Sequence, residues 1–108
     1  MAREKFHTLT EQMFYILLCL TEERCGTDLM AAVQDLTGGR VRVGPGTLYN
    51  LLEQFQTAGM IEETKVEGRR RSYRITAAGR QALSEEYRRI LTLAEDYRRM
   101  VPEEGATP

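Results

Sequence analysis

Several residue types and patterns that build reactive or cross-linked sites are scarce or missing here. Among 108 residues there are no tryptophans, one histidine and two cysteines. This set has no recognisable metal-ligand spacing, and two cysteines do not make a disulfide framework. The sequence also lacks a catalytic triad, a glycine-rich phosphate loop and a motif of paired buried carboxylates. We therefore expect a protein that is not an enzyme and that needs no metal or cofactor.

Long apolar runs are missing as well. No run approaches the roughly 20 residues with which a helix crosses a bilayer, so we expect no membrane partner. Residues 1–7 are charged and lack an apolar signal region, so we expect no export and a cytoplasmic location. The length suits one domain with a modest core.

Charge is nearly balanced overall but unevenly distributed. The formal net charge is −1, yet residues 40–76 hold seven basic residues against four acidic ones. Residues 1–39 hold three basic residues against six acidic ones. Electrostatic attraction acts over only about 8 Å at physiological salt, so the local excess decides which surface can attract an anion. The sequence places that surface in the middle of the chain.

Apolar spacing predicts two helices in the first 40 residues. The first starts at a capping-box pattern, Thr8 with Glu11, and is expected to end near Glu23. Cys19 falls in its apolar part and reads as a small core residue, whereas Cys25 lies nearer a helix end, with Arg24 the only basic residue close by in sequence. The second helix is capped by Gly26 or Thr27 and stops at Gly38-Gly39. Its expected apolar face is made of Leu29, Met30, Val33 and Leu36.

A third helix and a hairpin follow. Pro45 suits the first helical turn and Gly59 suits the end of the last one. Two strand-like runs come next, at 60–66 and 72–76, with Glu67-Gly68 starting the turn between them. Arg40 and Arg42 stand before this third helix, where they either contact phosphate or flank a first short strand.

A long last helix is predicted over 77–100, capped by Thr76 and ended by Pro102. At about 36 Å it is too long for a small domain to cover by itself. Its apolar positions alternate at intervals of four and three, which is a heptad seam. Core packing within one chain is the alternative, but the length argues for pairing with a second copy. The seam residues are Leu83, Tyr87, Ile90, Ala94, Tyr97 and Val101.

These elements give a mainly α fold with a small β-hairpin (α+β). Their order is that of a winged helix-turn-helix in residues 1–76, followed by a C-terminal dimerisation helix in 77–101 and a disordered tail in 102–108. In such a fold the third helix enters the major groove of DNA and the hairpin lies along the phosphates.

Candidate DNA contacts fall on the third helix and the hairpin. Asn50 and Gln54 can pair bidentately with adenine, and Thr47 can touch a thymine methyl or a phosphate. The plainer alternative is that these three are the solvated face of an amphipathic helix. Tyr49, at the border of that face, either bonds a phosphate or packs against the wing. At the expected turn tip, Arg69–Arg71 repel one another, which DNA phosphates would relieve.

The combined pattern resembles the PadR family of bacterial transcriptional regulators over about residues 9–83. The resemblance rests on Gly46-Thr47-Leu48-Tyr49, Ala58-Gly59-Met60-Ile61, the run from Gly68 to Thr76, and Gly79. It implies a homodimer, usually a repressor, that binds double-stranded DNA. In this branch some members bind flat hydrophobic compounds between the paired last helices, which makes a small hydrophobic ligand a candidate partner here. Drug-binding relatives carry a tryptophan where this chain has Ile90, which removes one platform for aromatic stacking.

A second function fits the same fold. Winged helices also serve as protein-interaction adaptors without DNA binding, and fold alone does not decide between the two. Salt-sensitive retention of random duplex DNA separates them, since an adaptor would show none.

Overall fold

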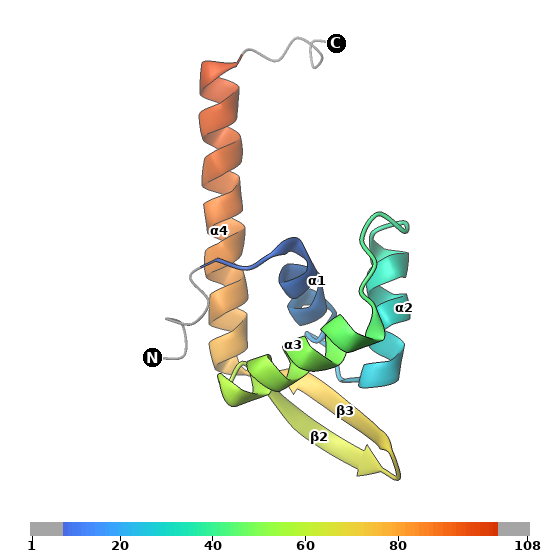
Figure 1. Ribbon diagram of the computed structural model, residues 1–108. Coiled ribbons are helices and arrows are strands. Elements are labelled where there is room, and N and C mark those ends of the chain that lie inside the picture. Colours follow the sequence, from blue (N-terminus) through green and yellow to red (C-terminus); the bar gives the residue numbers. More distant parts are fainter. Residues whose placement is uncertain (1–7, 102–108) are drawn as a thin grey trace.

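The computed structural model describes residues 8–101, so the expected tail at 102–108 lies outside the described residues. The described residues form four helices and one small antiparallel sheet, which lies at one end of the molecule (Figure 1). The sheet order is β1-β3-β2. This arrangement confirms the predicted α+β winged helix with a long C-terminal helix. The helices are α1 (Glu11–Cys19), α2 (Gly26–Leu36), α3 (Pro45–Thr57) and α4 (Ala77–Met100), and the strands are β1 (Arg24–Cys25), β2 (Ile61–Glu67) and β3 (Arg70–Ile75).

Helix α1 is shorter at both ends than its sequence pattern predicts. Its capping box is made by Thr10 and Met13, not by Thr8 and Glu11. The helix ends at Cys19 rather than near Glu23, because residues 24–25 leave to form β1 against β3. Two residues are enough for this strand, since the backbone is also tied by Ile75 N–H donating to Leu20 O at 2.8 Å.

Helix α2 begins at Gly26, with Cys25 as its N-cap, and ends at Leu36. Leu29 and Val33 are fully buried, whereas Leu36, at the last turn of the same face, is 55% exposed because no neighbouring element covers it. The chain then turns through Gly38 and Gly39 with φ of 63° and 82°, a region that glycine enters without steric strain.

Helix α3 has the predicted bounds. Pro45 occupies its first turn, and Gly59 follows it with φ of 77°. Met60 N–H then donates to Phe55 O at 2.8 Å, the hydrogen bond that closes a Schellman-type helix end. Its apolar face is buried throughout: Leu48, Leu51, Leu52 and Phe55.

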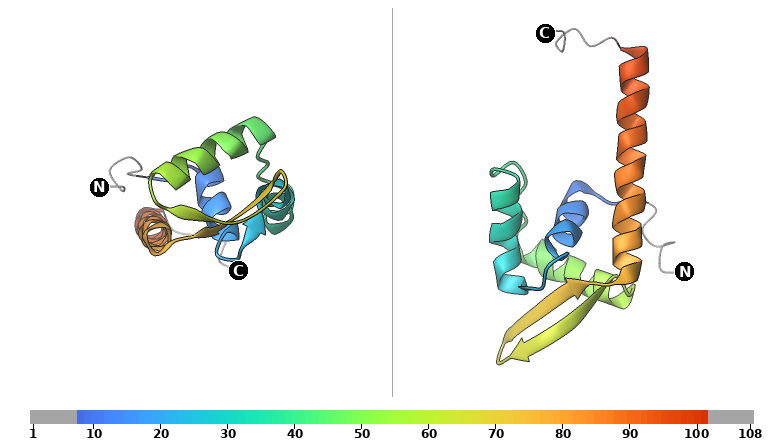
Figure 2. Two further views of the ribbon diagram at one scale, coloured as in Figure 1. Left: turned by 90° about the horizontal axis from the view of Figure 1, so that it is seen from below. Right: turned by 180° about the vertical axis from the view of Figure 1, so that it is seen from behind.

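The hairpin of β2 and β3, here called the wing, turns through Gly68-Arg69. Gly68 has φ of 64° at the first turn position, as a type II′ turn requires. Only Arg69 therefore lies at the turn; Arg70 and Arg71 belong to β3, which corrects their expected place at the tip. In Figures 1 and 2 the wing projects from one end of the molecule and α4 extends toward the other.

Helix α4 joins the core through its first turns. Gly79 lies so close to α3's end that a Cβ there would stand 2.1 Å from Met60 O. Ala82 is also fully buried, whereas every residue from Tyr87 onward is exposed. The helix thus packs at one end and stands clear of its own chain at the other. Among residues 8–101 no helix combines the length and apolar character that a bilayer crossing requires.

Candidate nucleic-acid interface

The outer face of α3 presents polar side chains to solvent. Thr47 and Asn50 are exposed, and Gln54 is half-buried. Residues three and four apart share one helix face, so these three form a continuous strip opposite the buried leucines. Glu53, which the sequence analysis did not single out, is exposed beside Asn50; a carboxylate there can accept from cytosine or repel phosphate.

The start of α3 carries two glycines that face open space. Neither Gly44 nor Gly46 has a neighbour within 4 Å of where a Cβ would stand, and neither has positive φ. Packing within the chain therefore does not require glycine at either position. The absence of side chains leaves the first-turn amides of α3 open to close approach by another surface.

The arginines of the wing already face carboxylates within the chain. Arg71 contacts Glu63 at 2.7 Å and Arg74 contacts Glu62 at 3.5 Å. Glu63 raises the pKa of Arg71 further. Alternation along β3 places Arg70 and Arg71 on opposite faces, so the expected mutual repulsion of the three arginines is largely relieved without DNA. Such exposed pairs are each worth less than about 1 kcal/mol, so phosphates can replace the carboxylates.

Arg69 differs from its neighbours. Within residues 8–101 no acidic partner lies within 4 Å of its guanidinium, and it occupies the turn. Arg70 is closer to the body of the domain, where it faces Asp28 of α2 at 3.8 Å. Arg69 is therefore the wing arginine most available to an external anion.

Arg40 and Arg42 take different roles. Arg40 forms an ion pair with Glu11, donates to the Tyr15 hydroxyl at 2.9 Å and lies over that ring at 5.7 Å. It therefore fastens the α2–α3 loop to α1. No strand forms at 40–43 in the described part of the chain, so the alternative of a short strand there is wrong. Arg42 is exposed, and its backbone oxygen accepts from Gln12 Nε2 at 3.0 Å.

Tyr49 borders a polar hollow of about 240 Å³. Its ring lies against the start of α2, where a Cβ on Gly26 would stand 3.3 Å from Tyr49 Cε1. The side chain is nevertheless 45% exposed. Both alternatives for Tyr49 thus remain compatible with its position. The hollow, here called the α2 hollow, is lined by Cys25, Gly26, Thr27, Tyr49, Arg69, Arg71 and Tyr73.

The two cysteines have opposite environments. Burial in α1 raises the pKa of Cys19, which Arg24 only partly opposes. Hydrogen bonding to Thr27, with a smaller contribution from Arg70, lowers the pKa of Cys25. Arg70 is 45 positions away in sequence, so the pairing of β1 with β3 is what supplies this cation.

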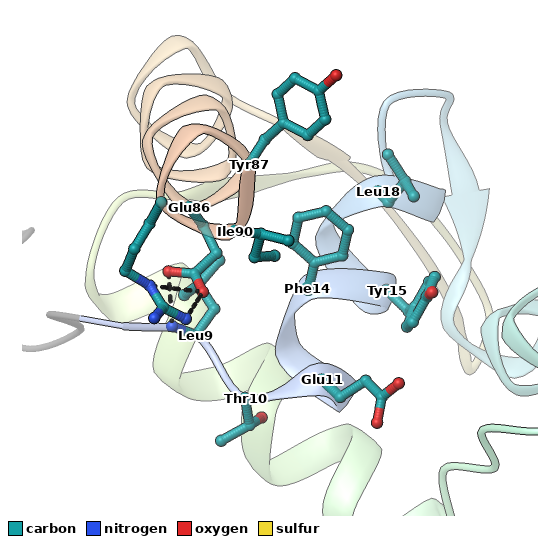
Figure 3. Close-up of a pocket in the computed structure, with 10 residues that line it drawn as sticks. Leu9, Thr10, Glu11, Phe14, Tyr15, Leu18, Glu86, Tyr87 and Ile90 are labelled. Carbon is teal, nitrogen blue, oxygen red and sulfur yellow. Dashed lines mark hydrogen bonds and ion pairs between the residues drawn. The ribbon is translucent and has the colours of Figure 1, made fainter. Parts of the chain in front are cut away.

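The outer half of α4 carries the predicted seam. Leu83 is only 9% exposed because it packs in the core of its own chain, so the exposed seam begins at Tyr87. Tyr87 and Ile90 are 54% and 41% exposed, and both line a groove of about 680 Å³ between α1 and α4 (Figure 3). Phe14 and Leu18 of α1 form the facing wall. Ala94, Tyr97 and Val101 lie farther along and are exposed.

Glu86 is the functional candidate that sequence reasoning missed. It is 4% exposed and accepts from Leu9 N–H at 3.2 Å and from Arg89 Nε at 3.1 Å (Figure 3). Its carboxylate therefore ties the segment before α1 to α4 at the edge of the groove. Its spacing of four from Ala82 and from Ile90 was the available signal, since it puts Glu86 on the inner side of the helix.

A three-helix core with a cationic wing and a polar third-helix face is the architecture of a DNA-binding transcriptional regulator. Comparison with known proteins supports this class. Residues 16–85 match the Transcriptional regulator PadR-like family, and the chain belongs to that family. Membership places it among transcriptional regulators rather than enzymes.

Individual relatives agree. The transcriptional regulator Rv3488 of Mycobacterium tuberculosis is 44% identical over 66 residues, 58% of this chain and 62% of that protein. The match thus spans less than two thirds of that relative's length. A PadR-family transcriptional regulator from Eggerthella lenta has a TM-score of 0.70 at 22% identity, covering 87% of this chain and 80% of that one. A transcriptional regulator from Clostridium thermocellum has a TM-score of 0.72 at 21% identity, covering 82% and 90%. At these identities the two structures share the fold.

Proposed function

We propose that the chain represses transcription as a homodimer bound to a palindromic DNA operator, in the cytoplasm. Each protomer inserts α3 into a major groove and lays its wing along the adjacent phosphates. The outer half of α4 carries this proposal, because a polar helix face and a cationic wing occur once per chain, and two copies are needed to read two half-sites.

Pairing through α4 is supported by what its outer half exposes. Seven large apolar side chains there are between 41% and 80% exposed, far more than scattered surface residues require. The groove beside them continues the same apolar surface onto α1. A second copy would bury both together by laying its own α4 along the seam. The seven are Tyr87, Ile90, Leu91, Leu93, Tyr97, Met100 and Val101.

Reading of sequence is assigned to α3. Asn50 and Gln54 offer amide groups for adenine, and Thr47 offers a methyl and a hydroxyl. Twofold pairing would set the two α3 helices about 34 Å apart, one turn of B-form DNA. Arg69, Arg70 and Arg71 of each wing supply attraction that does not depend on sequence.

Release by a small hydrophobic or aromatic ligand is assigned to the seam. Phe14, Leu18, Tyr87 and Ile90 give the groove an apolar, partly aromatic lining. A molecule lodged there changes how closely the second copy can pack, and hence the separation of the two α3 helices. Such a ligand weakens DNA binding only if it prefers one dimer geometry over the other.

Selection of bound sequences from a random duplex pool tests the proposal. We expect an inverted repeat with half-site centres one helical turn apart, and retention that falls steeply with salt.

Changing Arg69, Arg70 and Arg71 together to Ala should weaken all duplexes similarly and flatten the salt slope, whereas Asn50→Ala should change base preference.

The matched control is Arg88→Ala, which removes one exposed cation from α4 and should leave the salt slope unchanged. A protein-interaction adaptor is the competing outcome. It would enrich no sequence, and its retention on random duplex would not respond to salt or to the triple change.

A further inference from the structure

We propose that the α2 hollow seats one phosphate group of the DNA backbone, held by the start of α2, the two tyrosines and the wing. This inference rests on the proposed DNA binding and adds a specific phosphate site to it. The hollow brings together residues from α2, from α3 through Tyr49, and from the wing through Arg69, Arg71 and Tyr73. A DNA strand that leaves the major groove occupied by α3 and runs toward the wing would pass over the α2 hollow.

One wall of the hollow is the N-terminus of α2. The N-cap residue Cys25 makes no side-chain capping hydrogen bond. The first-turn amides at Gly26 and Thr27, which line the hollow, therefore lack the usual oxygen acceptor, and the Cys25 sulfur that faces the Thr27 N–H is a weak one. Amides without an oxygen acceptor and the positive end of an 11-residue helix favour an anion at this position.

Tyr73 gives an independent indication of a ligand. Its side chain is 94% buried, with 6% exposed, yet within residues 8–101 its hydroxyl has no hydrogen-bond partner. Burial raises the pKa of Tyr73, and Glu63, Arg71, Tyr49 and Cys25 also influence it, which places its polar end among the residues of the hollow. Among the described residues no buried polar side-chain atom lacks a partner, so the Tyr73 hydroxyl is the accessible tip of an otherwise buried side chain, and it can donate to an acceptor that enters the hollow.

The cations around the hollow can meet a phosphate. Arg69 has no acidic partner within residues 8–101. Arg71 uses Nη1 for Glu63 at 2.7 Å, which leaves donors on its other nitrogens. Asp28, the acidic residue in the first turn of α2, is already faced by Arg70 at 3.8 Å. The local field therefore stays positive.

The size and chemistry of the hollow select a phosphate group rather than a whole ligand. Its volume of about 240 Å³ lies below the 300–1,000 Å³ typical of small-molecule sites. Its Tyr49 hydroxyl lies 3.6 Å from where a Cβ on Gly26 would stand, so it faces the same helix start. Hydroxyls, amides and guanidinium groups together are the usual donors to a backbone phosphate.

A double-mutant cycle between protein and DNA tests the site. The duplex recovered from the random pool is synthesised with one uncharged methylphosphonate linkage at equivalent places in both half-sites, scanned along the backbone. We expect Tyr73→Phe to weaken binding of the unmodified duplex about tenfold per half-site, as for one hydrogen bond to a charged group. On the duplex whose uncharged linkage replaces the bound phosphate, and only on that duplex, Tyr73→Phe should cause no loss of affinity beyond that caused by the linkage itself.

Two controls keep the result interpretable. Thr92→Val removes an exposed hydroxyl from α4, on the side away from the seam, and should leave affinity unchanged. Tyr73→Phe should unfold at the same temperature as the parent chain or higher, because the hydroxyl it removes is unpaired. Effects that add at every linkage would overturn the phosphate site while leaving DNA binding itself intact. Failure of the parent chain to bind any duplex would instead overturn the proposed function.

Titration with inorganic phosphate distinguishes a DNA backbone phosphate from a free phosphate ion as the occupant of the hollow. Without DNA, we expect millimolar phosphate to shift the amide resonances of Gly26 and Thr27 and to do so less in Tyr73→Phe. Duplex DNA should shift the same amides and slow alkylation of Cys25, which lines the hollow, but not of Cys19. Shifts caused by inorganic phosphate together with an additive cycle on DNA would assign the hollow to a free anion and overturn the backbone assignment.

Discussion

The two halves of α4 belong to one uninterrupted helix but have opposite surroundings. From Ala77 to Glu86 the helix packs on its own chain, and Gly79, Ala82 and Leu83 are buried. From Tyr87 to Met100 every residue is exposed, although apolar residues continue at the same heptad spacing. Both halves are helical, but only the first half has the core of its own chain to pack against. The same seam is covered by the core in the first half and uncovered in the second, and the proposed dimer would use the uncovered part.

The largest effect is expected in the packed half. Gly79→Ala would place a methyl group 2.1 Å from Met60 O, where backbone rather than a flexible side chain must move. We expect the free energy of unfolding to fall by about 3 kcal/mol, measured by urea denaturation. Gly46→Ala is the matched control, because its Cβ meets open space. We expect this variant to raise the free energy of unfolding by about 0.4–1 kcal/mol. Equal stability of both variants would contradict the packing described for α4.

The exposed half should respond in association rather than in folding. Ile90→Glu places a charge in the centre of the seam, and we expect the dimer dissociation constant to rise about 30-fold or more, which corresponds to roughly 2 kcal/mol. Sedimentation equilibrium measures it. Thr92→Glu is the control, because it adds the same charge on the opposite side of the helix. If both variants dissociate alike, general charge rather than the seam governs association.

The sequence was sufficient to predict an element whose limits are set by residues within it or next to it. Helix α4 could be predicted closely from the Thr76 cap, the heptad spacing and Pro102. The bounds of α3 followed equally from Pro45 and Gly59. Strand β1 could not be predicted, because two residues have no periodicity and the strand exists only by pairing with β3.

The candidate site divides in the same way. The exposed polar strip of α3 follows from helical spacing, so Thr47 and Asn50 could be placed from sequence. The α2 hollow could not, because it joins residues from 25 to 73 that only the folded sheet brings together. The exposure of Leu36 could not be predicted for a related reason, since apolar spacing alone does not say whether a neighbouring element covers that position.

Glu86 stands at the border between the halves and should show an intermediate effect. Glu86→Gln keeps an acceptor for Leu9 N–H but removes the charge that holds Arg89. We expect the free energy of unfolding to fall by about 1 kcal/mol by urea denaturation, because a buried charged hydrogen bond is weakened. Glu95→Gln, on the exposed half, is the control and should have no measurable effect. A loss in the control variant as large as that in Glu86→Gln would remove the distinction between border and outer half.

The smallest effect is expected for the ion pair at the free end of α4. Asp96→Asn removes a pair with Arg99 that is exposed on both sides. Exposed pairs three residues apart on a helix contribute little, so unfolding and dimer dissociation should each change by less than about 0.5 kcal/mol. Thermal denaturation and sedimentation on the same sample check both. A larger loss of association would extend the contact surface beyond the apolar seam.

Sedimentation equilibrium of the unmodified chain at micromolar concentration, alone and with the selected duplex, tests twofold pairing most directly. Our account predicts a particle of two 12.4-kDa chains in both cases, and two chains per duplex. A single 12.4-kDa chain, free or on DNA, would contradict it.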